Sequence, residues 1–339
     1  MLVFRPSRLA DLPAIEKIAA KSPVGVTSLP DNRERLYAKI EASVKSMEAE
    51  VNGNGEESYF FVLEDTCTGE LVGTSGIVAS AGYQEPFYNY RNETLIHASR
   101  ELGVHSKIHV LSLCHDLTGN TLLTSFYIDE PYQYTEWSDL LSRARLLMIA
   151  AHPQRFGDAV VSEMVGLSDD HGNSPFWDGV GRLFFDIDYA QAELYCGIKG
   201  RSFIAELLPQ HPIYVPLLPE SAQEAIGQVH PTAMLPFEIL INEGFETERY
   251  VDIFDGGCVV QARTANIRTI AEHRRYKTEI GLVAEDAPTY LIANRKLADY
   301  RATVGAVLVD EPSGKVRLSL ALATALNVAE GDPIQICPL

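Results

Sequence analysis

The segment from Lys107 to Pro153 constrains the fold more than any other part of this sequence. It reads as a strand, a turn at Gly119-Asn120, a second strand over 121–128, an irregular loop, and an amphipathic helix over 138–151. The first strand carries apolar residues on both faces, which is typical of a strand covered on both sides. The Gly-Asn pair predicts a tight hairpin turn between the two strands. A loop that leads from a strand into a helix leaves free N–H groups at the helix N-terminus, which favours an anion such as a pyrophosphate. The alternative is that this segment is an ordinary strand-to-helix connection of an α/β fold and binds no anion.

Composition limits the class of protein. The 339 residues are 46% hydrophobic and 22% charged, which suits two globular domains or one large domain with an appendage. The net charge of −18 argues against nucleic acid or an anionic membrane as the main partner and is compatible with a cationic small molecule. We find no apolar run long enough to cross a membrane and no apolar signal core, so we expect a cytoplasmic protein. The five cysteines are scattered, which indicates free thiols and neither a disulfide framework nor a metal site.

Along the chain, periodicity predicts an α/β (α+β) protein whose mixed, mostly antiparallel sheet is built from local hairpins and flanked by helices. Asp31 is expected to cap a helix over 32–47. The aromatic residues of a helix over 174–185 are expected to be core rather than a ligand box. We expect an acyltransferase-like core over 1–263, a partly helical connector over 264–284, and a small β-rich, barrel-like unit over 285–339.

Two levels of resemblance follow from particular residues. The opening strand and helix, the hairpin FVLEDTCTGELVG (61–73) and the strand–loop–helix at 121–151 resemble the acyl-CoA N-acyltransferase (GNAT-like) fold. In that fold the fourth strand lends backbone groups to pantetheine, and the next helix N-terminus takes the pyrophosphate. Seven phrases in order along the chain resemble the arginine N-succinyltransferase family: GVTSLP (25–30), SYFFVLED (58–65), FYNYRNETLIHAS (87–99), SPFWDGVGRLFF (174–185), AELLPQHPIYVPLLP (205–219), IGQVHP (226–231) and EGFETERYVDIFDGG (243–257).

The family resemblance implies an activity. Its members transfer succinyl from succinyl-CoA to the α-amino group of arginine, the first step of arginine degradation to glutamate and succinate. Succinyl-CoA is then a co-substrate, with no prosthetic group and no metal. His230, in GQVHP, matches the family's proposed proton donor, and Phe126 matches a position that contacts succinyl-CoA. The loop 129–139 contains no Gly, Arg or Lys, so we expect pyrophosphate to depend on backbone N–H groups and on Arg143 or Arg145.

The substrate's charges suggest further candidates. A guanidinium prefers a carboxylate partner and can stack on an aromatic ring, whereas the succinyl carboxylate needs a cation or hydroxyls. The guanidinium candidates are Glu85, Glu93, Asp255, Tyr88 and Tyr90, and the succinyl candidates are Arg91, Thr27 and Ser28. The alternative is that the acids are solvated and the tyrosines packed. Neither Cys114 nor the pair His115-Asp116 has the setting of a nucleophile or a dyad, which favours direct transfer from CoA without an acyl-enzyme.

Other readings stay open at the level of sequence. Ornithine, with a shorter cationic side chain, could be the main acceptor. A non-catalytic subunit that binds CoA or arginine beside a paired enzyme is a different class of function. Since some family members occur as paired α and β chains, we expect either a homo-oligomer or such a pair.

Overall fold

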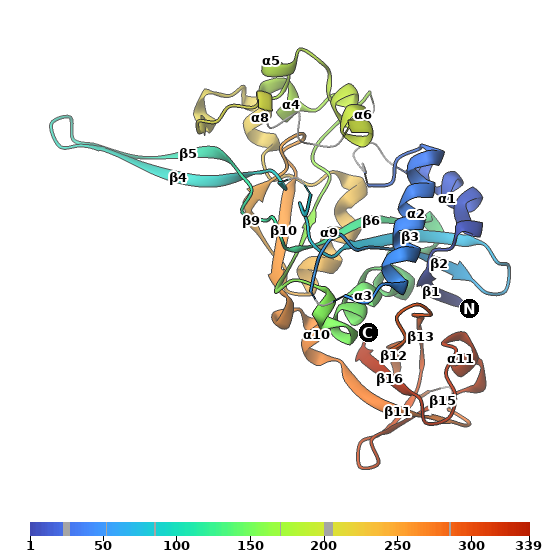
Figure 1. Cartoon of the computed structure of the whole chain (residues 1–339). Helices are drawn as coiled ribbons and strands as arrows, with labels where there is room; N and C mark the ends of the chain where they lie inside the picture. Colours follow the sequence, from blue (N-terminus) through green and yellow to red (C-terminus); the bar gives the residue numbers. More distant parts are fainter. Residues whose placement is uncertain (23–27, 52, 85, 170, 200–205, 285) are drawn as a thin grey trace.

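The computed structural model describes residues 1–22, 28–51, 53–84, 86–169, 171–199, 206–284 and 286–339, with only the backbone described for 196–199. One large open sheet runs through the molecule in the order β14-β15-β11-β16-β12-β13-β1-β2-β3-β6-β7-β10-β9-β4-β5-β8 (Figure 1). Within the described chain its pairs are antiparallel except β6–β7 and β11–β15. The predicted mixed, mostly antiparallel sheet flanked by helices is therefore confirmed. Among the same residues, no helix is both long enough and apolar enough to cross a bilayer.

The bounds of the elements are as follows. The strands are β1 (Leu2–Pro6), β2 (Ser58–Asp65), β3 (Leu71–Val78), β4 (Asn89–Ser99), β5 (Val104–Cys114), β6 (Thr121–Ile128), β7 (Ala159–Glu163), β8 (Ile213–Tyr214), β9 (Glu246–Val251), β10 (Cys258–Arg263), β11 (Arg274–Ile280), β12 (Thr289–Asn294), β13 (Ala302–Ala306), β14 (Leu308–Asp310), β15 (Lys315–Leu318) and β16 (Pro333–Pro338). The helices are α1 (Leu12–Ala19), α2 (Arg33–Glu48), α3 (Glu136–Ala151), α4 (Pro175–Gly179), α5 (Arg182–Phe185), α6 (Tyr189–Lys199), α8 (Glu220–Ala225), α9 (Met234–Asn242), α10 (Arg268–Glu272) and α11 (Leu320–Ala325).

Strands β1 to β3 lie between two helical layers. The side chains of strand β2 alternate between two cores. Phe60 and Val62 pack with α1 and α2, and the larger core that contains α3 takes Tyr59, Phe61 and Leu63. The hydroxyl of Ser43, on α2, accepts a 2.8 Å hydrogen bond from the N–H of Phe60 and holds the helix on the strand. The expected cap of α2 at Asp31 is wrong. Asn32 is the N-cap, because its side chain accepts from the N–H of Arg35.

Helix α3 is the structural centre of the molecule, and nearly all of its residues are buried. Residues of the C-terminal region, from Tyr300 onward, pack against the side of α3 that faces away from the cavity described below. Tyr300 donates to the carbonyl of Ala144 at 2.8 Å, and Gln335 donates to the carbonyl of Leu147 at 2.7 Å. Strand β13 also pairs with β1, so these strands continue the main sheet. The region expected to be a partly helical connector contains α10 and, in addition, strand β11.

The largest departure from expectation concerns strand β5. It forms no hairpin with β6 across Gly119-Asn120. It pairs along its whole length with β4 in a long two-stranded arm, and β6 pairs instead with β3 and β7. Residues 104–109 are exposed or only half-buried, so the expected cover on both faces is also wrong there. Gly119 does adopt a turn conformation, with φ of +90°, but the turn links two distant parts of the sheet.

The segment 174–185 is broken into α4 and α5 around Val180. Phe176 and Trp177 are fully buried in a second core beneath the arm, which confirms the core interpretation for these two side chains. Phe184 differs, because its side chain is 46% exposed.

Candidate functional site

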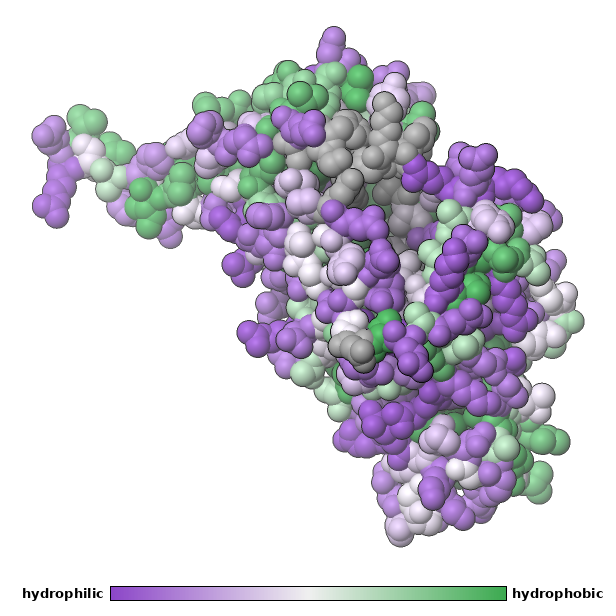
Figure 2. Space-filling model, in the orientation of Figure 1, coloured by the Kyte–Doolittle hydropathy of each residue, from purple (hydrophilic) through white to green (hydrophobic). Residues whose placement is uncertain are grey.

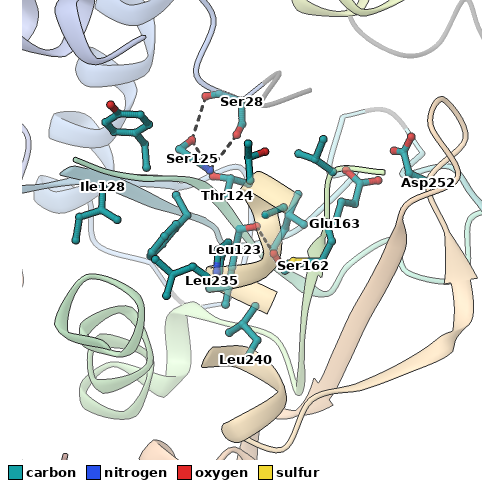
Figure 3. Close-up of a pocket in the computed structure, with 18 of the residues that line it drawn as sticks. Ser28, Leu123, Thr124, Ser125, Ile128, Ser162, Glu163, Leu235, Leu240 and Asp252 are labelled. Atoms are coloured by element: carbon teal, nitrogen blue, oxygen red, sulfur yellow. Dashed lines mark hydrogen bonds between the residues drawn. The ribbon is translucent and has the colours of Figure 1, made fainter. Parts of the chain in front are cut away.

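The site begins where two neighbouring parallel strands separate. Strands β6 and β7 pair only at Thr121↔Val160 and Leu122↔Val161. Just beyond, the hydroxyl of Ser162 bridges to the carbonyl of Leu123 at 3.1 Å, and no further pairing follows in the described chain. The carboxyl ends of parallel strands are where α/β proteins bind ligands. A cavity of about 740 Å³ opens between these two strand ends (Figure 3).

Strand β6 carries a β-bulge in the wall of this cavity. The register against β3 shifts between Thr74 and Gly76, and Ser125 takes a φ of +56°. Ser28 holds the bulge, because its hydroxyl accepts from the N–H of Ser125 at 2.9 Å while its carbonyl accepts from the Ser125 hydroxyl at 3.0 Å. On the neighbouring strand β3, Gly76 lies beside the bulge, and a Cβ at this position would lie 2.8 Å from the Thr124 hydroxyl. Bulges of this kind redirect backbone groups and are common beside active sites.

One side of the cavity is basic. Lys21, Arg35 and Lys39 line it from the α1–α2 side, and Arg145 lines it from α3. Burial lowers the pKa of Lys39 to about 8, and its ammonium lies 5.1 Å from the centre of the Phe60 ring. Burial also lowers the pKa of Arg145 to about 9. Positive charge on this side suits the anionic groups of an acyl donor.

The other side is acidic. Glu163 at the end of β7, Glu193 on α6, and Asp252 and Asp255 after β9 all line the cavity. Asp252 and Asp255 are nearly inaccessible to solvent. Burial, together with the carboxylates of Asp252 and Glu193, raises the pKa of Asp255 well above its usual range. Figure 3 shows Glu163 and Asp252 across the cavity from Ser28 and Ser125, with Leu235 and Leu240 below.

A rigid turn holds the acidic side. Asp255 accepts hydrogen bonds from the N–H groups of Gly166 and Gly257, at 2.7 and 2.8 Å, and from the Tyr189 hydroxyl at 3.3 Å. Gly257 lies so close to the segment after β7 that a Cβ would be 2.1 Å from the carbonyl of Met164. The turn therefore fixes both carboxylates relative to β7.

His230 lies at the rim of this cavity on a loop tied to the same turn. Its N–H donates to the carbonyl of Val165 at 2.8 Å, and the residues that follow it, Pro231 and Thr232, line the cavity. The Nδ1 atom lies 2.7 Å from the Thr232 hydroxyl and accepts from the Thr232 N–H at 3.3 Å. Because a backbone N–H can only donate, this contact favours the neutral tautomer with its proton on Nε2.

The structure brings together some sequence candidates and separates others. Ser28 and Phe126 line the cavity, as does Asp255. Arg91 and Glu93 do not line it: they pair with each other at 2.9 Å, and Arg91 also pairs with Asp116 at 2.7 Å.

The aromatic candidates lie behind the cavity wall. Tyr90 is buried, and its hydroxyl finds no hydrogen-bond partner in the described part of the chain. Burial and the charge of Asp252 raise the pKa of Tyr90. Tyr88 stacks on His115. Two further candidates, Thr27 and Glu85, lie outside the described residues.

The two arginines expected near the pyrophosphate differ. Of the two alternatives, Arg143 is engaged away from the cavity, where it contacts Glu243 at 3.0 Å and the carbonyl of Pro338 at 2.7 Å, which favours Arg145. Arg145 lies beneath Phe126, with its guanidinium 5.9 Å from the ring centre. The helix N-terminus is capped by the side chain of Thr135, which accepts from the N–H of Trp137.

The residues that were considered for covalent chemistry are half-buried or engaged elsewhere. Cys114 is half-buried, and burial raises the pKa of its thiol, which is unfavourable for a nucleophile. Asp116 is engaged by Arg91 and by the Tyr250 hydroxyl. Across the described ranges, no group of His, Cys, Asp or Glu is arranged to hold a metal ion.

Sequence reasoning missed much of the cavity wall. Glu163, Glu193 and Asp252 come from three separate elements, and Arg35 and Lys39 come from a fourth. Asp252 lies within the phrase VDIFDGG, three residues before the candidate Asp255, so its neighbourhood was a usable signal. The others carry no local pattern that sets them apart from ordinary surface charges.

Comparison with known protein families gives two matches that together cover almost the whole chain. Residues 2–269 match the family described as arginine N-succinyltransferase beta subunit, and residues 274–338 match the C-terminal domain of that subunit.

Individual relatives match at full length. The chain is 58% identical to the arginine N-succinyltransferase subunit alpha of Pseudomonas aeruginosa, over 99% of each chain. It is 38% identical to an arginine N-succinyltransferase of Escherichia coli, over 100% of this chain and 98% of the relative. The solved structure of arginine/ornithine succinyltransferase subunit AI from Pseudomonas aeruginosa superposes with a TM-score of 0.92 at 55% identity, covering 100% of this chain and 98% of that one.

Proposed function

Because this chain belongs to the arginine N-succinyltransferase family, we propose that it transfers the succinyl group of succinyl-CoA to the α-amino group of L-arginine. The products are N2-succinyl-L-arginine and CoA. The chain is thus an acyltransferase of arginine metabolism. The observation that carries the substrate assignment is the division of one cavity into a basic and an acidic side.

The acyl donor occupies the β6 side in this proposal. The bulged strand around Ser125 and Phe126 presents backbone groups to the pantetheine arm, and the separation from β7 makes room for it. Lys39 and Arg35 face the succinyl carboxylate, while Arg145 and the N-terminus of α3 lie toward the phosphates. These features support a fold of the acyl-CoA N-acyltransferase type for residues 1–263.

The acceptor occupies the acidic side. A guanidinium or ammonium near Asp252 and Asp255 compensates two carboxylates that the protein has placed in a water-poor setting. Its arrival stabilises the ionised form of Asp255, because an opposite charge lowers a carboxyl pKa. The α-amine then lies between the two sides, within reach of the thioester.

The reaction proceeds by direct aminolysis. The neutral amine attacks the thioester carbonyl, the C–N bond forms, the C–S bond breaks, and the amine loses one proton. Backbone N–H groups of the bulge stabilise the oxyanion. His230 passes the proton on Nε2 to the departing thiolate and regains the proton that the amine loses, so that CoA leaves as the thiol and the imidazole ends neutral, with Thr232 holding Nδ1.

The remaining architecture supports a small β-rich, barrel-like unit over 285–339 joined through 264–284. This unit braces the rear of α3 through Tyr300 and Gln335. We place the protein in the cytoplasm, where succinyl-CoA is available. An assembly of identical chains or of paired α and β chains completes the proposal.

The test is release of free CoA thiol from succinyl-CoA by the purified chain, with arginine, ornithine and lysine as acceptors. Arginine-dependent release supports the proposal, and Asp252→Asn is expected to raise the KM for arginine more than tenfold with little change in that for succinyl-CoA. The matched control is Asp310→Asn, which neutralises an exposed carboxylate on β14, at the end of the sheet. If release is faster with ornithine than with arginine, ornithine is the main acceptor. Binding of both substrates with no turnover would identify a non-catalytic subunit.

A further inference from the structure

Cationic side chains gather at the C-terminal end of α3. His152 is the C-cap of the helix, and Arg155 lies in the turn that follows it. Two more cations come from the C-terminal strands: Arg275 of β11 donates to the carbonyl of Ala150 at 3.2 Å, and Arg295 directly follows β12. None of the four lines the cavity of the candidate site. We call His152, Arg155, Arg275 and Arg295 the basic cluster.

The register of the sheet explains why the two strand arginines meet α3. Strand β16 lies between β11 and β12, and its Gln335 is paired with Arg275 on one side and with Ala293 on the other. Paired residues share a face of a sheet, and Gln335 faces α3, because it donates to the carbonyl of Leu147 at 2.7 Å. Figure 1 shows α3, β12 and β16 next to one another at the C-terminus. The visible face of the lower part of the molecule, which holds these strands, is mostly hydrophilic apart from an apolar patch at its right edge (Figure 2).

The charge of the basic cluster is not balanced by carboxylates of the described residues. The charges that act on His152 are those of Arg155 and Arg295, and the charge that acts on Arg295 is that of Arg275. Arg155 is 5% exposed and donates only to neutral oxygens, those of the Ser46 and Ala49 carbonyls and the Tyr59 hydroxyl. Acidic residues are abundant in this chain, with 46 against 28 basic ones. Buried charges are normally paired, so this cluster lacks the expected partner.

Two nitrogens of the cluster are buried without a hydrogen-bond partner among the described residues, Nε2 of His152 and Nε of Arg295. Cations often lie at helix C-termini, because the terminal carbonyls carry partial negative charge. This explains Arg275, which binds a carbonyl of α3, and Arg155, which binds carbonyls at the end of α2. It leaves the two unpaired nitrogens unexplained, and a buried donor without an acceptor destabilises the folded chain.

We propose that the basic cluster binds a phosphate group. A guanidinium presents its N–H groups in a planar fork that fits phosphate oxygens, and phosphate brings about two negative charges to the cluster. The Nε atom of Arg295 gains an acceptor. Burial and the two neighbouring guanidiniums lower the pKa of His152 to about 4, so its imidazole is neutral while the site is empty, and a bound anion favours the protonated ring that donates from Nε2.

The phosphate site is separate from the site of the acyl donor. Helix α3 has 16 residues, so about 24 Å separate its two ends. The N-terminal end lies toward the phosphates of CoA in the proposed function, whereas the basic cluster lies at the other end. Its members come from the helix and from two C-terminal strands, and a bound phosphate therefore ties these strands to α3. Free inorganic phosphate and the phosphates of a nucleotide present the same chemistry to the cluster.

The experiment titrates the purified full-length chain with inorganic phosphate, ATP or succinate in a calorimeter, in phosphate-free buffer at constant ionic strength. Saturating CoA is present throughout to occupy the other site. The variant Arg295→Met removes the charge and keeps the length of the side chain, and Arg295→Lys keeps the charge without the fork. The matched control is Arg182→Met on α5, at the top of Figure 1, whose side chain is 50% exposed. Thermal unfolding of each chain with and without phosphate is the second measurement.

One phosphate is expected to bind per chain and to raise Tm by about 2 °C at about ten times Kd. Arg295→Met is expected to bind phosphate about tenfold or more weakly and to lose this rise, with a smaller loss in Arg295→Lys and none in Arg182→Met. Without phosphate, Arg295→Met is expected to be at least as stable as the wild type, because an uncompensated cation has been removed. Tighter binding of ATP than of phosphate identifies a nucleotide as the source, and equal or weaker binding identifies free phosphate.

Four results overturn the proposal. They are no phosphate binding by the wild type, binding that is unchanged in Arg295→Met or lost equally in Arg182→Met, and succinate binding as tight as that of phosphate. The fourth is an Arg295→Met chain that loses the same stability with and without phosphate, since this would show that Arg295 has only a structural role. None of these readouts depends on succinyl transfer, so failure of the proposed function is seen separately in the CoA-release assay.

Discussion

A buried charge pair behind the cavity offers a sharp test of how the molecule is held together. Glu243 is fully buried, and its carboxylate forms an ion pair with Arg143 at 3.0 Å and accepts hydrogen bonds from Arg268 at 3.0 Å and from the N–H of Thr269 at 2.7 Å. Arg143 is itself only 1% exposed. The substitution Glu243→Gln keeps the shape and one acceptor oxygen, but it removes the charge and turns an NH₂ group toward one of the three donors.

The magnitude follows from the burial. Breaking a buried ion pair costs about 3–5 kcal/mol because the remaining charge has no compensation, and the retained amide oxygen of Gln reduces this loss to about 3 kcal/mol. The unfolding entropy is about 2.1 cal/mol/K per residue, which for 339 residues gives about 0.7 kcal/mol/K. We therefore expect Glu243→Gln to lower Tm by about 4 °C.

The assay is urea unfolding followed by circular dichroism, together with a calorimetric Tm. The control is Glu41→Gln, which removes an exposed pair with Lys45 at 3.0 Å and is expected to change stability by less than about 0.5 kcal/mol. The double variant Arg143→Met with Glu243→Gln is expected to lose at least about 1 kcal/mol less than the sum of the single variants. A Glu243→Gln chain that is as stable as Glu41→Gln would refute the reasoning.

Three further predictions concern the site. His230→Gln is expected to lower kcat about 10²-fold in the CoA-release assay. Thr232→Val is expected to lower kcat about tenfold, with recovery in Thr232→Ser, because the Thr232 hydroxyl orients the imidazole. An unchanged kcat in Thr232→Val would show that Thr232 does not position His230. Lys39 is charged below its pKa of about 8 and neutral above it, so the KM for succinyl-CoA is expected to rise between about pH 7 and about pH 9, and Lys39→Arg is expected to flatten that profile in steady-state kinetics. Gly257→Ala is expected to cost about 3 kcal/mol or more in urea unfolding, since its Cβ would lie 2.1 Å from the Met164 carbonyl and cannot be accommodated by a side-chain movement; a loss below about 1 kcal/mol would show that this turn is not rigid.

The sequence was sufficient wherever a structure depends on local periodicity. The helix expected over 138–151 is observed as α3, and the hairpin over 61–73 is observed as β2 and β3. Apolar spacing and turn residues encode such elements within a few residues of one another. Two candidates named from the sequence, Ser28 and Phe126, line the cavity, and their binding roles stay predictions.

Pairing between strands could not be read locally. Gly119-Asn120 is a genuine turn, but a turn sequence does not state which strand lies beside the next, and β6 found its neighbours in β3 and β7. The exposure of 104–109 also escaped prediction, because alternating apolar residues on a protruding ribbon look the same in sequence as those in a buried strand. Arg143 shows the same limitation for charge, since its partner Glu243 lies 100 positions away along the chain.

The position of β1 in the sheet has a consequence for synthesis. The strand lies between β2 and β13, and the Thr303 hydroxyl donates to the carbonyl of Leu2 at 2.7 Å. Ribosomes add about 5–20 residues per second, so the first strand of this chain waits roughly 15–60 s for the neighbour that covers its outer edge. A nascent chain with an uncovered strand edge is prone to aggregate. Chains that stall or end before residues 302–306 are therefore expected to be insoluble. The need for chaperones during synthesis is expected to last until these residues, near the end of the chain, have been made.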